Sequence, residues 1–331
     1  MTDYHFPLET LHAEAISPDM PECTAILVVR GPQPGVMYEL GRLFPQDQKR
    51  IFYVEDPVQN KLLSIISAAH IMHIPCIILS GEDCPPPEGF FEFGNGHASL
   101  ISQGSGEDGF VSHFTGSKTL QHFAWLGFQN YLADNATLET IGTRFFESLR
   151  LGEFRNNPRS AEPLLRDASV HFVDLKAVRH SDAPDGLGMS PNGLYAEEIC
   201  TLGRYIGLST RFRLSVIYGY PSSANNNSLV SKLVAQVIWH ITEGLAVSFP
   251  EYPEKDPSRF QRKVVQLGDG GQEMVFLQSR QSGRWWIEVP NLKELSSPML
   301  ISCSIDDYKT ACRGEIPLKW LFFYQKSNNF S

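Results

Sequence analysis

Short apolar runs recur along the first 250 residues, and several of the gaps between them have helical periodicity. The runs are apolar on both faces, which is typical of parallel strands covered by helices on each side. The alternation of strand and helix predicts one three-layer αβα domain with a mainly parallel sheet. We expect strands at Ala25–Arg30, Ile51–Glu55, Cys76–Ser80, Ala98–Gln103, His122–Phe128, Val170–Leu175 and Leu214–Tyr220.

Three of the intervening helices are clear from their apolar spacing. One covers Leu62–Ile71 and ends before Pro75, and a second covers Leu194–Ile206. The third, Leu229–Leu245, repeats apolar residues at i, i+4, so one of its faces must be core.

The pattern changes after Pro250, where a polar, proline-bearing segment follows. Apolar runs separated by glycine turns then predict a β-meander, followed by a short helix and an aromatic segment. The runs are Lys263–Leu267, Glu273–Gln278 and Arg284–Val289, the turns are Gly268–Gly271 and Gly283, and the last two segments are Ile305–Ala311 and Trp320–Tyr324. We therefore predict two domains, an α/β domain over residues 1–250 and a small α+β appendage over residues 251–331.

The net charge of −9 argues against nucleic acid or an anionic membrane surface as the main partner. No stretch approaches the about 18 uninterrupted apolar residues of a membrane span. The first residues lack the basic region and apolar run of a secretory signal, so we expect a cytoplasmic protein. The six cysteines are scattered without a C-x-x-C pair and are expected to be buried free thiols.

One segment stands out as a candidate site. The chain contains no G-x-x-x-x-G-K-[ST], G-x-S-x-G or H-E-x-x-H motif. In Val170–Tyr195, however, a strand leads into a loop dense in charges and glycines and then into a helix. Ligands of open α/β sheets bind at the carboxyl ends of strands, so this loop lies where a site is expected.

This segment resembles the ureohydrolases, the family of arginase, agmatinase and formimidoylglutamase. The run Val173–Pro184 (V-D-L-K-A-V-R-H-S-D-A-P) aligns without a gap with the family strand F-D-V-D-A-L-D-P-S-F-A-P. Leu214–Pro221 is similar to the family's L-D-I-V-E-V-N-P strand, and Ile77–Cys84 occupies the place of its I-x-L-G-G-D-H-S strand. The resemblance spans roughly residues 20 to 250. Five further positions match the glycine-rich loop and the helix start, namely Gly186, Gly188, Pro191, Gly193 and Leu194.

The resemblance implies an arginase-like fold and a homo-oligomer, because family members commonly form trimers or hexamers. It also implies hydrolysis of guanidino or amidine C–N bonds by two Mn²⁺ ions held by carboxylates and imidazole. Carried over residue by residue, only Asp174 keeps its ligand type, whereas Lys176 stands at the second aspartate. The ligand histidine falls at Asp83 or no further than one residue away, in a stretch without histidine. The substrate-gripping glutamate is Tyr218, and the D-A-H-x-D motif has no counterpart after Ala98–Gln103.

Two dications need several anionic oxygens and imidazole, which one aspartate beside a lysine does not supply. We therefore expect a catalytically degenerate arginase-fold protein, a binding or assembly module without a cofactor. On one strand face, Asp174 and Lys176 are expected to pair with each other. Two alternatives stay open: an active C–N hydrolase with Mn²⁺ in a shifted site, and a non-hydrolytic sensor of a cationic metabolite. The shifted site would draw on His97, Asp83, Glu82, Glu107 or Asp108.

Charged residues crowd the loop after the candidate strand, where they either grip a polar ligand or form a loop-stabilising ion network. Of these, Arg179, His180 and Asp182 join Asp174, Lys176 and Tyr218 as candidate residues of the emptied site. In the appendage, Trp285 and Trp286 are expected to place one ring in the core and leave one half-exposed. This would suit a surface for docking the main domain or a protein partner.

Overall fold

The computed structural model describes residues 5–45, 50–56, 61–105, 110–188, 190–267, 273–290 and 298–328. The chain divides into two compact units. The first comprises Met1–Thr137 and Ser148–Ser248, and the second comprises Leu138–Glu147 and Phe249–Ser331. The pattern of apolar residues does not predict that Leu138–Glu147 belongs to the second unit.

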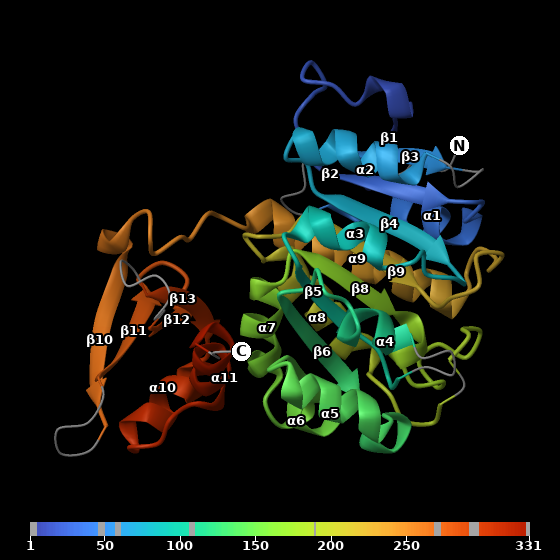
Figure 1. Ribbon diagram of the computed structural model, residues 1–331. Coiled ribbons are helices and arrows are strands. Elements are labelled where there is room, and N and C mark those ends of the chain that lie inside the picture. Colours follow the sequence, from blue (N-terminus) through green and yellow to red (C-terminus); the bar gives the residue numbers. More distant parts are fainter. Residues whose placement is uncertain are drawn as a thin grey trace. The chain divides into compact units, whose positions relative to one another are not determined.

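The described residues form a nine-stranded sheet in the order β1-β3-β2-β4-β9-β8-β5-β6-β7 (Figure 1). Neighbouring strands from β1 to β6 in this order are parallel, which confirms the predicted sheet. The seven predicted strands are present with ends that differ by no more than two residues. The strands are β1 (Leu8–Thr10), β2 (Cys23–Arg30), β3 (Arg50–Asp56), β4 (Cys76–Gly81), β5 (His97–Ile101), β6 (His122–Phe128), β7 (Glu147–Arg150), β8 (Val170–Asp174) and β9 (Leu214–Tyr218).

Helices cover both faces of this sheet, as the apolar strands require. On one face α8 packs against α9, α1 packs against α9, and α7 packs against α8. In Figure 1, α2, α3 and α4 cover the opposite face. The helices are α1 (Pro34–Gly41), α2 (Leu62–Ile71), α3 (Glu88–Phe91), α4 (Phe110–Thr115), α5 (Asn135–Thr143), α6 (Leu151–Asn156), α7 (Ala161–Asp167), α8 (Ala196–Gly207) and α9 (Leu229–Val247). Short 3-10 helices are η1 (Ala13–Ala15), η2 (Glu92–Gly94), η3 (Asn130–Leu132), η4 (Pro158–Ser160) and η5 (Leu175–Ala177).

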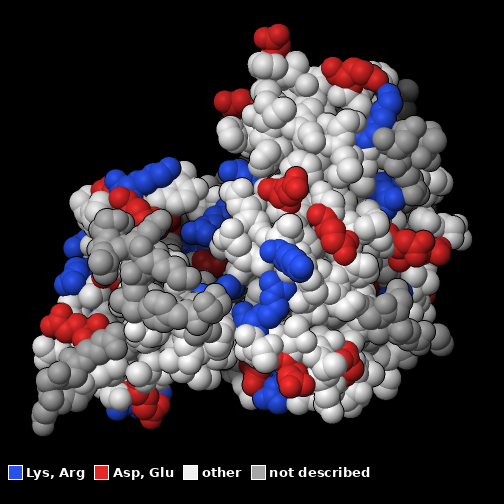
Figure 2. Space-filling view, viewed as in Figure 1, with Lys and Arg blue, Asp and Glu red and all other residues white. Residues whose placement is uncertain are grey.

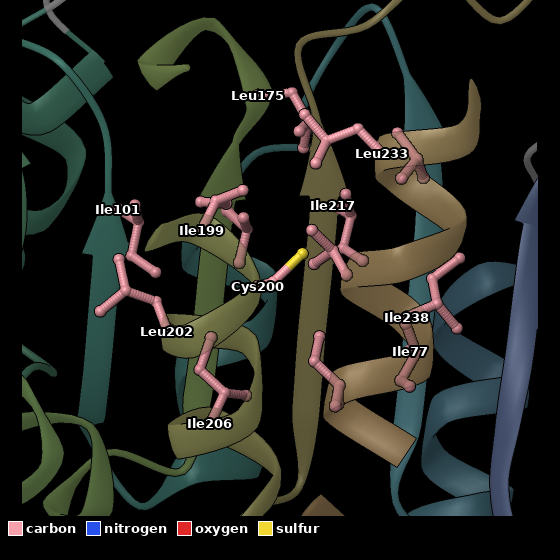
Figure 3. Close-up of a cluster of buried hydrophobic side chains, with 14 of the residues drawn as sticks. Ile77, Ile101, Leu175, Ile199, Cys200, Leu202, Ile206, Ile217, Leu233 and Ile238 are labelled. Atoms are coloured by element: carbon pink, nitrogen blue, oxygen red, sulfur yellow. The ribbon is translucent and has the colours of Figure 1, made fainter. Parts of the chain in front are cut away.

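Alternate residues of each central strand fill the two halves of the core. Ile77 of β4 and Ile217 of β9 face α8 and α9, where Figure 3 shows Cys200 of α8 next to Ile217 and Ile238 of α9 next to Ile77. Phe172 of β8 instead packs edge-on against Phe114 of α4 on the other face, with ring centroids 5.1 Å apart. Full burial of each such side chain contributes about 1.5–3 kcal/mol, so the alternation fixes the register of the strands.

The described residues of the second unit form a four-stranded antiparallel sheet in chain order, as the predicted meander implies. The predicted turn at Gly268–Gly271 lies outside the described residues. The aromatic segment Trp320–Tyr324 is part of a helix that packs against β12. The elements are η6 (Pro257–Arg259), β10 (Phe260–Gln266), β11 (Glu273–Ser279), β12 (Trp285–Val289), β13 (Met299–Cys303), α10 (Ile305–Cys312) and α11 (Leu318–Asn328).

The expectation that one ring of the tryptophan pair is half-exposed is wrong, because Trp285 and Trp286 are each only 6% exposed. Trp285 stacks on Tyr308 of α10 with ring centroids 4.8 Å apart. Trp286, on the other face of β12, meets Phe260 edge-on at 5.3 Å. Aromatic residues on both faces bury both rings, so the pair supplies no exposed aromatic patch.

None of the helices in the described ranges combines the length and the hydropathy that crossing a bilayer requires. On the face of the molecule shown in Figure 2, the acidic and basic side chains of the described residues are interspersed.

Candidate functional site

A cavity of about 1060 Å³ opens at the carboxyl ends of β4, β5, β8 and β9, the four adjacent strands at the centre of the sheet. The order in which the chain adds strands to the sheet reverses among these strands, and such a reversal creates a crevice at the carboxyl ends of the strands. The described lining residues are Glu82, Asp83, Cys84, Ser102, Gln103, Gly104, Ser105, Phe110, Leu132, Asp174, Lys176, Leu187 and Tyr218. Three of the six candidate residues, Asp174, Lys176 and Tyr218, are thus brought together.

Asp174 is the last residue of β8, and its carboxylate is held by the backbone around it. The Oδ1 atom accepts a hydrogen bond from the backbone N–H of Lys176 at 2.9 Å, which starts the turn η5. On the neighbouring strand, Gly219 has φ +80°, and a Cβ added there would lie 2.1 Å from the same oxygen. Only glycine allows β9 to leave the sheet this close to the carboxylate.

The expected ion pair between Asp174 and Lys176 on one strand face is not present. The strand ends at Asp174, and Lys176 lies in η5, where the two-residue repeat of a strand no longer applies. The hydrogen bond between the two residues joins the carboxylate to the backbone N–H of Lys176 and not to its ammonium. Within the described part of the chain, this half-buried lysine makes no ion pair.

Cys84 contributes a neutral thiol to the cavity. Burial, and next the negative charge of Asp174, raise the pKa of the Cys84 thiol well above its ordinary value, while Arg30 opposes the shift. A thiol that stays protonated is a poor nucleophile and a poor metal ligand. The sequence analysis did not select Cys84 as a site residue and counted it among the scattered buried thiols. Its position shortly after β4, in the segment aligned with the family's histidine motif, is the sequence feature that could have identified it as part of the cavity.

The wall after β5 consists of hydroxyl and amide groups that fix the loop. Ser102 Oγ accepts a hydrogen bond from Trp125 Nε1 at 2.8 Å, and Ser105 Oγ accepts one from the backbone N–H of Asp134 at 3.0 Å. A Cβ at Gly104 would lie 2.4 Å from the carbonyl oxygen of Leu132, so two loops meet closely here. This wall offers neither carboxylate nor imidazole among its described residues.

Tyr218 ends β9 directly beside Asp174 in the register of the two strands. Its side chain is 6% exposed, and its ring lies 5.5 Å from that of Phe110 of α4. The aromatic pair narrows the cavity on the α4 side.

The remaining candidates stabilise the loop and the helices after it. Asp182 accepts a hydrogen bond from Arg179 Nε at 2.7 Å and another from the backbone N–H of Ala196 at 2.9 Å. The guanidinium groups of Arg179 and Arg155 both lie 4.1 Å from the ring centre of Tyr195. This geometry favours the ion-network interpretation of the loop, because Asp182 pairs with Arg179 and its carboxylate also accepts from the first N–H of α8.

His180 and Asp185 also have local partners. His180 is exposed, and its Nδ1 atom lies 3.3 Å from the carbonyl oxygen of Gly188. Asp185 accepts a hydrogen bond from the backbone N–H of Val230 at 3.0 Å, at the start of α9.

The described donor set does not fit a binuclear manganese centre. Among the described residues, no group of three or more histidine, cysteine, aspartate and glutamate side chains is placed to hold a metal ion. His97, which the shifted site would use, is the first residue of β5. It therefore lies at the amino-terminal ends of the strands, whereas the cavity lies at their carboxyl ends. Glu107 and Asp108, also considered, lie outside the described residues.

Comparison with known proteins finds the fold among ureohydrolase structures. The chain is similar to a Trypanosoma cruzi formiminoglutamase structure with a TM-score of 0.60 and 11% identity, covering 72% of this chain and 98% of that one. Another structure of that protein contains Mn²⁺. A formimidoylglutamase from Bacillus subtilis matches with a TM-score of 0.58 and 14% identity over 75% of this chain and 94% of that one.

An arginase from the same species matches with a TM-score of 0.52 and 11% identity over 70% of this chain and 100% of that one. No protein-family model matches the chain, and no curated protein matches it either. The chain therefore has the arginase-like α/β fold that the motif resemblance implies. More specifically, its first unit carries that fold around a cavity at the expected strand ends, followed by a small antiparallel sheet.

Proposed function

We propose that this protein is a catalytically degenerate member of the arginase-fold proteins that binds a small molecule without hydrolysing it. The observation that supports the proposal is the pair at the end of β8, where one aspartate is held by backbone contacts and a lysine follows in the cavity wall. An ammonium group in this wall repels a dication, and the neutral Cys84 thiol adds no negative charge to attract one.

The alternative is a metal-dependent hydrolase of guanidino or amidine C–N bonds. It is supported by the similarity of the fold to structures of formiminoglutamase, formimidoylglutamase and arginase. The donor set of the described residues weighs against it, because hard dications need several carboxylates together with imidazole.

Metal analysis separates the two functions. The purified full-length protein is incubated with Mn²⁺, dialysed and analysed for metal, and its release of urea, ammonia or formamide is assayed with arginine, agmatine and formimidoylglutamate. We expect no stoichiometric manganese and no product. About two Mn²⁺ per chain together with product would overturn the proposal.

Replacement of the lysine sharpens this test. The Lys176→Asp variant restores the residue type that the family resemblance places there, but it leaves the cavity without histidine in its described lining. We expect the variant to remain free of manganese and to be less stable than the wild type, because a second carboxylate then lies near Asp174. A manganese-loaded, active Lys176→Asp variant would mean that the missing ligands exist after all.

A further inference from the structure

The cavity contains positive and negative side chains on different structural elements. Lys176, in η5, is half-buried. Glu82 and Asp83, in the loop after β4, are exposed at the cavity wall. A partly desolvated ammonium group is costly unless an anion balances it.

Asp174, the nearest carboxylate in sequence, does not form that ion pair. Its Oδ1 atom is engaged by the backbone N–H of Lys176 and lies against the backbone of Gly219. Among the described residues, no other carboxylate pairs with the lysine. A half-buried ammonium group therefore lines a cavity of about 1060 Å³, large enough for a metabolite of amino-acid size.

In the loop after β5, Ser102 Oγ accepts a hydrogen bond from Trp125 Nε1 and donates one to the carbonyl oxygen of Gly104, and Ser105 Oγ accepts one from the backbone N–H of Asp134. Gln103 adds an uncharged amide to the lining, and its Oε1 atom is buried without a hydrogen-bond partner among the described residues. The charges that a ligand carries are then selected by the charged side chains of the cavity. Glu82 and Asp83 favour a cationic group on the same ligand.

We propose that Lys176 binds the carboxylate of a small zwitterionic metabolite whose cationic group is balanced by Glu82 and Asp83. The inference rests on the proposed function, since it assigns to a lysine the region that metal would occupy in a hydrolase. It goes beyond that function by stating that Lys176 in η5 recognises the carboxylate of the ligand rather than its cationic group.

The test uses pairs of compounds that differ only in an α-carboxylate. Binding of L-arginine and agmatine, L-ornithine and putrescine, and L-lysine and cadaverine to the full-length protein is measured by calorimetry up to about 10 mM. We expect the carboxylate-bearing member of at least one pair to bind at least about tenfold more tightly. In Lys176→Met, which keeps the length of the side chain, the ratio for that pair should fall to about one.

Two further variants assign the charges. Lys118→Met removes an exposed lysine before the amino-terminal end of β6, whereas the cavity lies at the carboxyl ends of the strands. This variant should leave the ratio unchanged. The double variant Glu82→Gln/Asp83→Asn should weaken both members of the pair equally, because both carry the cationic group.

The proposal fails if no carboxylate-bearing compound binds, if the two members of every pair bind equally, or if Lys176→Met preserves the ratio. Failure of the proposed function would instead appear as bound manganese and product release, which the binding ratio does not measure.

Discussion

At the residue scale, the imidazole of His171 is a polar group buried in one of the central strands. His171 of β8 is fully buried, accepts or donates one hydrogen bond with Ser99 Oγ at 2.8 Å, and stacks on Phe212. Burial lowers the pKa of His171 to about 3. The imidazole is therefore neutral in the folded protein, since its charged form would have to be desolvated.

This predicts a loss of stability in acid. The folded-state pKa lies below the ordinary value of about 6.5, so the contribution of His171 is complete above pH 6.5 and declines as the pH falls toward 3, by at most about 1.4 kcal/mol per pH unit. Denaturant unfolding at several pH values measures the slope. Nuclear magnetic resonance of the His171 ring checks its origin, with no protonation expected between pH 7 and 5.

A ring that titrates near pH 6.5 in the folded protein would contradict the prediction. The matched variants are His171→Gln, which should reduce the slope, and His180→Gln, the same change at an exposed position, which serves as the control.

At the scale of elements, the sequence predicts strands and helices with a regular apolar pattern, and it does not predict where a turn interrupts that pattern. Strands such as β6 were predicted to the residue, because apolar runs covered on both sides leave little freedom. The site was predicted only in part. Period-two reasoning placed Lys176 beside Asp174, but the hydrogen bond that caps η5 ends the strand between them. The segment at Trp320 was not recognised as a helix because aromatic runs suit strands equally well.

The contact between α8 and α9 gives a second prediction. A Cβ at Gly207 would lie 2.0 Å from the carbonyl oxygen of Ile241, so the two helices approach too closely for a side chain. Gly207→Ala should lower the unfolding free energy by about 1–3 kcal/mol, although alanine has the higher helix propensity. Gly152→Ala in α6, where nothing lies within 4 Å of the added Cβ, is the control and should be neutral or slightly stabilising.

Equal effects of the two alanine substitutions in a denaturant titration would mean that the helices can separate without loss, and would refute close packing as the reason for glycine here.

At the scale of the whole molecule, assembly stays a prediction that follows from the ureohydrolase resemblance. We expect a homo-oligomer, measured as the mass of the full-length chain by light scattering at micromolar concentration. A monomer mass of 37.2 kDa throughout would contradict it.

The division into two units, each with its own apolar core, predicts that they respond separately to mutation. Glu251 tests this, because its side chain is 2% exposed and its carboxylate accepts hydrogen bonds from Ser279 Oγ and from Ser282 Oγ, the latter at 2.8 Å. Its other oxygen lies 3.4 Å from the guanidinium of Arg284. These bonds tie the segment before β10 to the turn between β11 and β12.

Glu251→Ala should remove one carboxylate that accepts hydrogen bonds from two hydroxyls and faces the mostly buried guanidinium of Arg284, which costs about 1–3 kcal/mol for each hydroxyl that finds no other acceptor. Hydrogen exchange followed by peptide mass spectrometry should then show faster exchange in β10–β13 and little change in β4, β8 and β9. Glu254→Ala, at an exposed position three residues further on, should leave both sets unchanged. If Glu251→Ala accelerates exchange equally in both sheets, the two units unfold together, because the segment Leu138–Glu147 that belongs to the second unit is inserted in the sequence of the first.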